Sequence, residues 1–261
     1  MFPELFEIAG NTIYSYGVLI AVGAALGFYY TSYHAKKELN IEPDKIQTLA
    51  IMIILAAFIG GKFFFYLEKP GFYFNPPSNM LKNFRTGFVF YGSLLFVIPT
   101  VIWYFRKNKL PVLPMLDIIA ITGTIVHFFG RLGCFAAGCC YGLPTNSSLG
   151  ITFTDEASKA KPLHEALHPT QLYEATLIFS IFLILNMLKR YQRFQGQLFL
   201  AYIALYAVGR GVVEIYRGDI RRGFIIEDIL SHSQLISLLM VGGVLFFYLR
   251  LSKKAPKLKK G

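Results

Sequence analysis

The sequence predicts an all-α integral membrane protein with about seven transmembrane helices in one bundle. Hydrophobic residues make up 54% of the 261 residues and charged residues only 16%, whereas soluble domains are about a quarter charged. The mean hydropathy is +0.49. Apolar stretches long enough to cross a hydrocarbon core of ~30 Å, which takes about 20 residues of helix, recur along the chain. Because the net charge of +11 accompanies such spans, it indicates contact with lipid head groups rather than nucleic acid.

The first predicted span is uncharged from Ile8 to Ala35 and lacks the basic start of a signal peptide, so we expect it to be retained. The third runs without charge between Arg85 and Arg106, and the seventh between Asp228 and Arg250. With no repeat or separate soluble domain, residues 1–261 form a single predicted domain, in which 131–169 is an irregular outer loop. The spans cover 11–34, 47–67, 86–105, 111–130, 170–188, 197–216 and 233–250.

Basic residues predict the orientation of the bundle. The connections "KKELNIEPDK", "RKNK" and "KRYQR" and the tail "KKAPKLKKG" hold more than half of the 26 lysines and arginines. The positive-inside rule therefore predicts a cytoplasmic C-terminus and an outer N-terminus. The longer connections, 68–85, 131–169 and 217–232, then lie on the outer, periplasmic side of a bacterial cytoplasmic membrane.

Ionisable residues inside the predicted spans indicate polar chemistry, because an unpaired charge is costly in hydrocarbon. We expect Lys62 and Glu174 to extend to the membrane interface. The others are expected to face the bundle interior or an aqueous cavity. They are Asp117, His127, Arg210 and Glu214.

An anion site is predicted near the outer ends of spans four and six. His127 and Arg131 are four residues apart and share one helical face, and a guanidinium matches the geometry of phosphate oxygens. In "GRGVVEIYRGD", Arg210, Glu214 and Arg217 share another face. There Glu214 would orient one arginine while the other meets an anion. Two other interpretations stay open. Arg131 would only anchor its helix to lipid head groups, or Glu214 would only neutralise Arg210.

The segment "HPTQLYEA" contributes a further histidine, His168. Thr170 is expected to cap the fifth span, and Glu174 to interact with the dipole of its first turn. Capping of this helix does not explain why a histidine stands at position 168.

All three cysteines, Cys134, Cys139 and Cys140, lie in "HFFGRLGCFAAGCCYG". Their spacing lacks paired C-x2-C ligands, which argues against zinc and predicts no metal site. Packing of a tight loop is the first interpretation, a disulfide the second, and a nucleophilic thiolate with His127 or His168 as base the third.

The segments "GRLGCFAAGCCYGLPT", "HPTQLYEA" and "GRGVVEIYRGD", in this order, resemble the prolipoprotein diacylglyceryl transferases, in a cysteine-bearing subtype. The resemblance covers nearly the whole chain. It implies transfer of the diacylglyceryl group of phosphatidylglycerol to the lipobox cysteine thiol of preprolipoprotein signal peptides. A thioether forms and glycerol 1-phosphate leaves. The resemblance assigns Arg131 and Arg210 to the head group and leaving phosphate, and Glu214, Arg217, Tyr16 and Gly142 to the same site.

The chain departs from the familiar members at two places. Tyr91 stands where they have a histidine often proposed as the base, and cysteines stand where they have asparagine and polar residues. His127 or His168 is therefore expected to transfer the proton. A lipid-binding or accessory protein of the same fold, a transferase with another thiol or lipid, and a transporter stay open. No cofactor motif is present, so none is expected.

Overall fold

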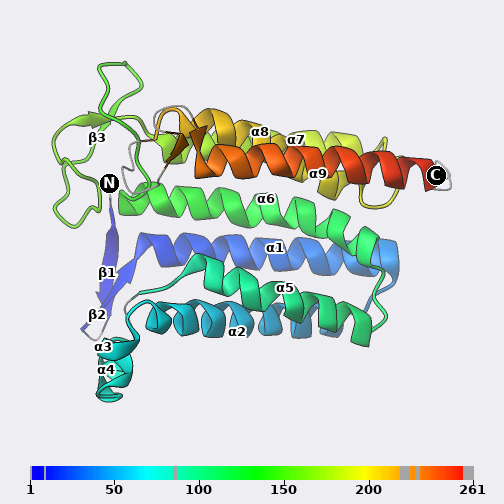
Figure 1. Cartoon of the computed structure of the whole chain (residues 1–261), viewed down its shortest axis with the longest axis horizontal. Helices are drawn as coiled ribbons and strands as arrows, with labels where there is room; N and C mark the ends of the chain where they lie inside the picture. Colours follow the sequence, from blue (N-terminus) through cyan, green and yellow to red (C-terminus); the bar gives the residue numbers. More distant parts are fainter. Residues whose placement is uncertain (1, 9, 85–86, 218–223, 227–229, 255–261) are drawn as a thin grey trace. The chain divides into compact units, whose positions relative to one another are not determined.

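The computed structural model describes residues 2–8, 10–84, 87–217, 224–226 and 230–254 (Figure 1). Its long helices are α1 (Ser15–Leu39), α2 (Pro43–Leu67), α5 (Phe90–Lys107), α6 (Val112–Ala137), α7 (Thr170–Lys189), α8 (Gln197–Glu214) and α9 (His232–Lys254). Two short helices are α3 (Pro70–Phe74) and α4 (Ser78–Lys82). Three antiparallel pairs join β1 (Glu4–Ile8) to β2 (Asn11–Tyr14), β3 (Ile151–Thr152) to β4 (Ala166–Leu167), and β5 (Phe224–Ile226) to β6 (Leu230–Ser231).

Each predicted span coincides with one long helix of the described chain. Five helical segments are long and apolar enough to cross a membrane: Pro43–Leu67, Val112–Ala137, Thr170–Lys189, Gln197–Glu214 and Gln234–Lys253. The prediction of a mostly helical membrane protein is therefore confirmed. Seven crossings and the orientation stay predictions. Arg85, Thr86, Asp228 and the basic tail 255–261, which entered those predictions, lie outside the described residues.

The predicted boundary after the fourth span is wrong. Helix α6 continues to Ala137, so Arg131 and Cys134 are helical rather than in a loop. The helix ends where Gly138 adopts a positive φ of 69°. The Gly138 amide then donates to the Phe135 carbonyl at 3.1 Å and the Cys139 amide to the Cys134 carbonyl at 3.0 Å. These two bonds form the Schellman motif, in which glycine takes the left-handed position that other residues avoid.

Backbone contacts divide the chain into two compact units, and the first comprises residues 1–31 and 116–261. Within it, α1 approaches α6 closely at two glycines four residues apart, an arrangement of small residues common between membrane helices. A Cβ added at Gly23 would lie 2.7 Å from the Phe129 Cβ, and one at Gly27 would lie 2.8 Å from Val126. Apolar side chains of α6, α7 and α8 form the core: Ala120, Ile121, Ile178, Ile181, Leu185 and Leu198.

Asp117 of α6 orients the start of α8, the helix that carries Arg210 and Glu214. Its carboxylate is buried and accepts hydrogen bonds from the Gly196 amide at 2.6 Å and the Phe199 amide at 3.1 Å. A carboxylate near a helix N-terminus also meets the positive end of the helix dipole. The charge that the sequence places inside the fourth span is therefore satisfied by the backbone of α8.

The second unit comprises residues 32–115 and is built on the pairing of α2 with α5. Gly60 and Gly92 meet at the contact between the two helices, where either Cβ would collide with the other backbone. The predicted extension of Lys62 to the interface is wrong, because this residue is 8% exposed. Its amine donates to the Gly87 carbonyl at 3.0 Å and lies 5.5 Å from the centre of the Phe84 ring.

Candidate functional site

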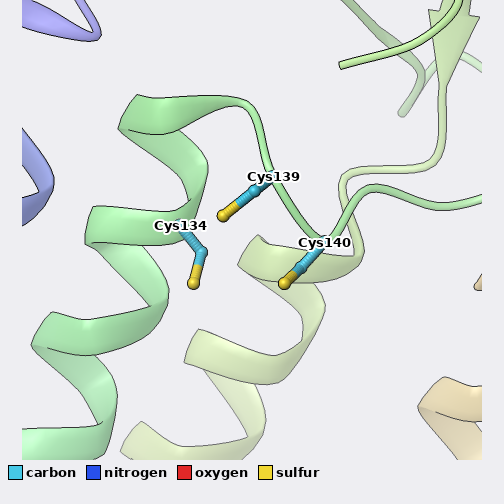
Figure 2. A group of neighbouring side chains, drawn as sticks. All are labelled: Cys134, Cys139 and Cys140. Atoms are coloured by element: carbon cyan, nitrogen blue, oxygen red, sulfur yellow. The ribbon is translucent and has the colours of Figure 1, made fainter. Parts of the chain in front are cut away.

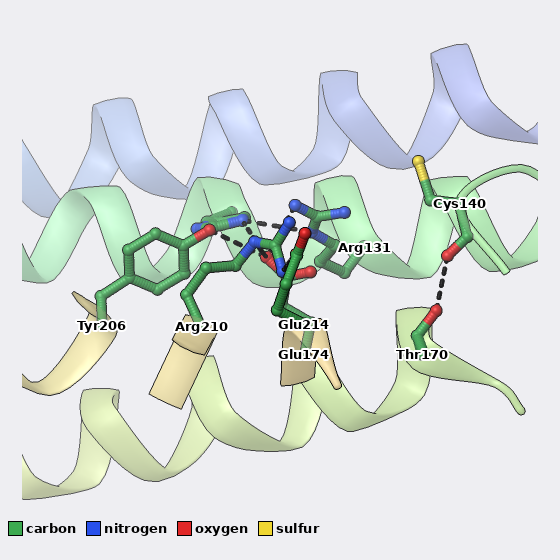
Figure 3. Close-up of polar contacts among 8 residues, drawn as sticks. Arg131, Cys140, Thr170, Glu174, Tyr206, Arg210 and Glu214 are labelled. Carbon is green, nitrogen blue, oxygen red and sulfur yellow. Dashed lines mark hydrogen bonds and ion pairs between the residues drawn. The ribbon is translucent and has the colours of Figure 1, made fainter. Parts of the chain in front are cut away.

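Glu174, in the first turns of α7, is the centre of a buried polar cluster (Figure 3). Its Oε1 atom lies 2.7 Å from Arg131 of α6, and it accepts a hydrogen bond of 2.8 Å from the Tyr206 hydroxyl of α8. The same oxygen lies 3.7 Å from His127 Nε2 and 4.0 Å from Arg210 Nε. Helices α6 and α8 thus deliver two guanidinium groups, an imidazole and a phenol to one carboxylate of α7.

The prediction that Glu174 snorkels to the interface is wrong, because this residue is only 1% exposed. Packing of α7 against α6 and α8 decides its environment. The sequence carries a signal for this: Glu174 shares the buried face of α7 with Ile178, Ile181 and Leu185, which lie one to three turns further along the helix. A charged side chain on the same helix face as core residues is buried, so it needs a buried partner of opposite charge.

His127 and Arg131 share one face of α6, as the sequence predicts, and the structure shows in addition that they are hydrogen-bonded. Arg131 Nε donates to His127 Nε2 at 3.2 Å, as the four-residue spacing on one helix allows. The Tyr206 ring meets the His127 ring edge to face, with centroids 5.1 Å apart. The Nε2 lone pair therefore faces the cluster rather than the apolar core.

The predicted pairing of Arg210 with Glu214 is also confirmed, with Nη1 and Oε2 2.6 Å apart. Arg217 does not continue that helical face, because α8 ends at Glu214. The chain beyond the helix pairs instead with the end of the cysteine loop, defined as residues 138–143. Arg217 forms an isolated β-bridge with Gly142, and the Leu143 amide donates to the Tyr216 carbonyl at 3.0 Å.

The cysteine loop is held by the first residues of α7. Thr170 Oγ1 donates to the Cys140 carbonyl at 2.7 Å, and Gln171 Nε2 donates to the Cys139 carbonyl at 2.8 Å. The predicted capping by Thr170 is wrong, since the N-cap position is Pro169 and no side chain caps α7. The hydroxyl is instead used to fix the loop on the helix.

Gly142 serves the same loop by leaving room for its neighbours. A Cβ at this position would collide with the Tyr216 carbonyl oxygen and lie 2.7 Å from the His168 Cβ. Its amide donates to the His168 carbonyl at 2.8 Å. Gly142 therefore supports the site through the backbone and offers no side chain to a ligand.

The three thiols of the loop and of α6 lie together (Figure 2). The sulfur atoms of Cys134, Cys139 and Cys140 are free and all lie within 4.8 Å of one another. Hydrogen bonds from the other two thiols lower the pKa of Cys140 below its ordinary value, and the positive charges of Arg217 and Arg131 add to this against the opposing effect of burial.

The remaining predicted residues take different places. His168 lies beside Tyr173, with Nδ1 3.0 Å from the Tyr173 hydroxyl, and its ring meets Tyr216. The Tyr16 ring packs on the last turns of α6, where a Cβ on Gly133 would lie 3.0 Å from it. Tyr91 belongs to the unit 32–115 and is 71% exposed.

Sequence reasoning did not identify Tyr206, and it gave no role to Gln171, which it expected to point to a different side of α7 from Glu174. Tyr206 lies four residues before Arg210 on α8, so helical spacing places both on the cluster face. Gln171 is 0% exposed and lies three residues before Glu174 on the same face of α7. In both cases the sequence signal was a polar residue three or four positions before a charged residue, on the same helix face.

Comparison with known proteins gives a consistent result. The family model described as prolipoprotein diacylglyceryl transferase matches residues 3–250. A phosphatidylglycerol–prolipoprotein diacylglyceryl transferase of Clostridium tetani is 36% identical, covering 92% of this chain and 94% of that protein. A second enzyme of this name, from Clostridium perfringens, is 32% identical, covering 93% of this chain and 93% of that protein. One from Campylobacter hominis is 28% identical, covering 99% of this chain and 94% of that protein.

Proposed function

Given that the chain belongs to the prolipoprotein diacylglyceryl transferase family, we propose that it moves the diacylglyceryl group of phosphatidylglycerol onto the cysteine thiol of a prolipoprotein. One observation carries the assignment of the site: two arginines from different helices, Arg131 and Arg210, converge on the buried carboxylate of Glu174. A displacement that expels a phosphate group needs such paired cations where the charge develops.

In the proposed reaction, the thiolate sulfur attacks the glyceryl carbon that carries the phosphate oxygen. The carbon–sulfur bond forms as the carbon–oxygen bond breaks, and the bonding electron pair leaves with the phosphate of glycerol 1-phosphate. Guanidinium groups bind such oxygens with two parallel hydrogen bonds. Arg131 and Arg210 hold the leaving phosphate in this proposal, while Glu174 and Glu214 orient the two arginines.

The charge balance of the site suits a phosphodiester. Arg131, Arg210 and Arg217 carry three positive charges, and Glu174 and Glu214 carry two negative charges. Three positive charges against two negative charges leave one positive charge over. A phospholipid head group with a single phosphodiester charge neutralises it, which favours a lipid such as phosphatidylglycerol over a doubly charged phosphate monoester.

The acceptor and its side of the membrane are part of the proposal. The acceptor is the lipobox cysteine of a preprolipoprotein signal peptide, and the site opens to the outer face of the bacterial cytoplasmic membrane. Seven spans with an outer N-terminus and a cytoplasmic C-terminus follow from the positive-inside rule. Reporter fusions to the two termini test this orientation, since a periplasmic enzyme reporter is active only at an outer terminus.

A turnover assay tests the function directly. Purified protein in detergent is mixed with phosphatidylglycerol and a lipobox peptide, and the peptide mass and released glycerol phosphate are followed. We expect a gain of one diacylglyceryl group, absent when the peptide cysteine is serine. If a folded protein that binds phosphatidylglycerol transfers nothing, the chain is a lipid-binding or accessory protein, or uses another thiol.

We propose that a histidine accepts the thiol proton. His127→Ala is expected to lower turnover by on the order of 100-fold, the usual contribution of a positioned base, because its Nε2 faces Arg131 and Glu174. His168→Ala is expected to cost less, since its ring contacts Tyr173 and Tyr216. Initial rates at several pH values measure both effects. Wild-type rates in both variants would exclude a histidine base.

A further inference from the structure

The three cysteines form a set of soft donors with the dimensions of a metal site. Their sulfur atoms lie within 4.8 Å of one another, and Zn–S bonds of about 2.3 Å place two sulfurs of a tetrahedral site roughly 3.8 Å apart. Movements of about 1 Å or less therefore bring the three sulfurs onto one ion. Sulfur ligands select zinc and other soft metals over magnesium or calcium.

The backbone explains how neighbouring cysteines face the same point. The Schellman motif at the end of α6 brings the side chains of its first and last residues, here Cys134 and Cys139, into contact. Cys140 then adopts a positive φ of 63°, a conformation that is costly for a residue with a Cβ and that concentrates at functional sites. Figure 2 shows the result, with three sulfur atoms gathered between α6 and the loop.

The loop is fixed before any ligand arrives. Hydrogen bonds from Thr170 and Gln171 hold the carbonyls of Cys140 and Cys139 against α7, so the sulfurs are preorganised by rigid supports. Gln171 is fully buried, and its Oε1 atom has no hydrogen-bond partner among the described residues. An unpartnered buried acceptor beside the loop suits a polar ligand at this place.

Nearby cations compensate the charge that such a site would carry. Three thiolates and one Zn²⁺ sum to a single negative charge. The positive charge of Lys159, which is not among those counted for the lipid phosphate, acts on Cys139, and Arg131 and Arg217 also lie within electrostatic reach of Cys140. A site with an excess of negative charge is therefore tolerable here without further ligands from the protein.

We infer that Cys134, Cys139 and Cys140 bind one zinc ion that keeps its fourth coordination position for the thiol of the acceptor peptide. Three protein ligands and one open position are the pattern of catalytic rather than structural zinc. This inference rests on the proposed transferase function and gives the site a means of activating the thiol. It replaces the expectation, drawn from cysteine spacing alone, that no metal binds.

The chemistry balances without an oxidant or reductant. Binding of the peptide thiol to zinc releases its proton, since a coordinating thiol is deprotonated, and one of the proposed histidines passes that proton to water. The zinc-bound sulfur then forms the bond to the glyceryl carbon as the carbon–oxygen bond to phosphate breaks. The product thioether carries no charge, so it is a weaker ligand than a thiolate and leaves the metal.

Metal content is the first test. Tag-free protein, purified in detergent under reducing conditions, is incubated with zinc sulfate, dialysed against a weak chelator and measured by mass spectrometry of the metal. We expect one zinc per chain. With cobalt(II) in place of zinc, a thiolate-to-cobalt charge-transfer band is expected in the near ultraviolet. Zinc content no higher than that of a triple cysteine-to-serine variant overturns the proposal.

Single variants separate the site from adventitious binding. Cys134→Ser, Cys139→Ser and Cys140→Ser are each expected to lose zinc and the cobalt band. His34→Ala, which removes a surface pair with Glu38 where a stray ion could bind, is expected to keep both. Thermal unfolding of each variant without metal shows whether it is folded. Full zinc binding by the folded triple variant would also overturn the proposal.

Turnover measurements distinguish the zinc proposal from the proposed transferase function on which it rests. Removal of zinc by a strong chelator is expected to lower transfer to a small fraction of its rate, and one equivalent of zinc is expected to restore it. Undiminished transfer by zinc-free protein refutes the zinc proposal and leaves the transferase function standing. A zinc-loaded protein that transfers nothing refutes the transferase function, and with it the role assigned to the metal.

Discussion

Arg131→Ala and Arg210→Ala are each expected to reduce diacylglyceryl transfer by roughly 1,000-fold, the upper range for removal of one donor that stabilises a developing oxyanion. Both guanidinium groups are mostly buried beside Glu174. Water therefore substitutes poorly for a missing guanidinium group. The loss should appear mainly in kcat, because charge builds on the phosphate only as the carbon–oxygen bond breaks. Initial rates with phosphatidylglycerol and a lipobox peptide measure it.

Lysine variants and a surface arginine serve as controls. Arg131→Lys keeps the charge but not the two-pronged donor, so an intermediate rate is expected. Arg193→Ala removes an exposed arginine between α7 and α8 and is expected to leave the rate unchanged. Near-normal turnover in folded Arg131→Ala or Arg210→Ala protein would refute the phosphate assignment for that arginine.

Glu174→Ala is expected to lower the free energy of unfolding by about 3–5 kcal/mol, the usual effect of leaving a buried ion pair with one partner. Glu174 is 1% exposed and contacts Arg131, Tyr206 and Arg210. Its removal leaves two buried cations without their shared counter-charge. Thermal or denaturant unfolding in detergent measures the loss.

Glu174→Gln separates positioning from stability. The amide keeps the volume and an acceptor for the Tyr206 hydroxyl, but it removes the charge that orients both arginines. We expect a smaller loss of stability and a large fall in kcat at similar KM. Glu156→Gln, at an exposed loop position, is the matched control. Unchanged kcat and stability in the Glu174→Gln protein would contradict a role for this carboxylate in arranging the site.

Several features of the fold and site followed from local sequence patterns. Apolar stretches of helical length located all seven long helices of the described chain. Four-residue spacing predicted that His127 and Arg131 share one helix face and that Glu214 orients an arginine, and in the structure both pairs are in contact. Such predictions succeed because hydrophobic length and helical periodicity act within one or two turns of the same segment.

Other features depended on segments far apart in the sequence. The position of Glu174 at the centre of the cluster requires the rotation of α7 that faces it to α6 and α8. The convergence of the cysteines requires the left-handed turn after α6 and the anchoring of the loop by Thr170 and Gln171.

The sequence by itself determined a helical membrane protein of a known family, with its basic and acidic residues placed at particular helix ends. Only the tertiary structure decided that Glu174 joins Arg131 to Arg210 and that three sulfur atoms meet. The physical reason is that periodicity fixes which side chains share one helix face. Packing between helices then decides which faces meet, and the high cost of an unpaired buried charge selects the arrangement in which each charge finds its partner.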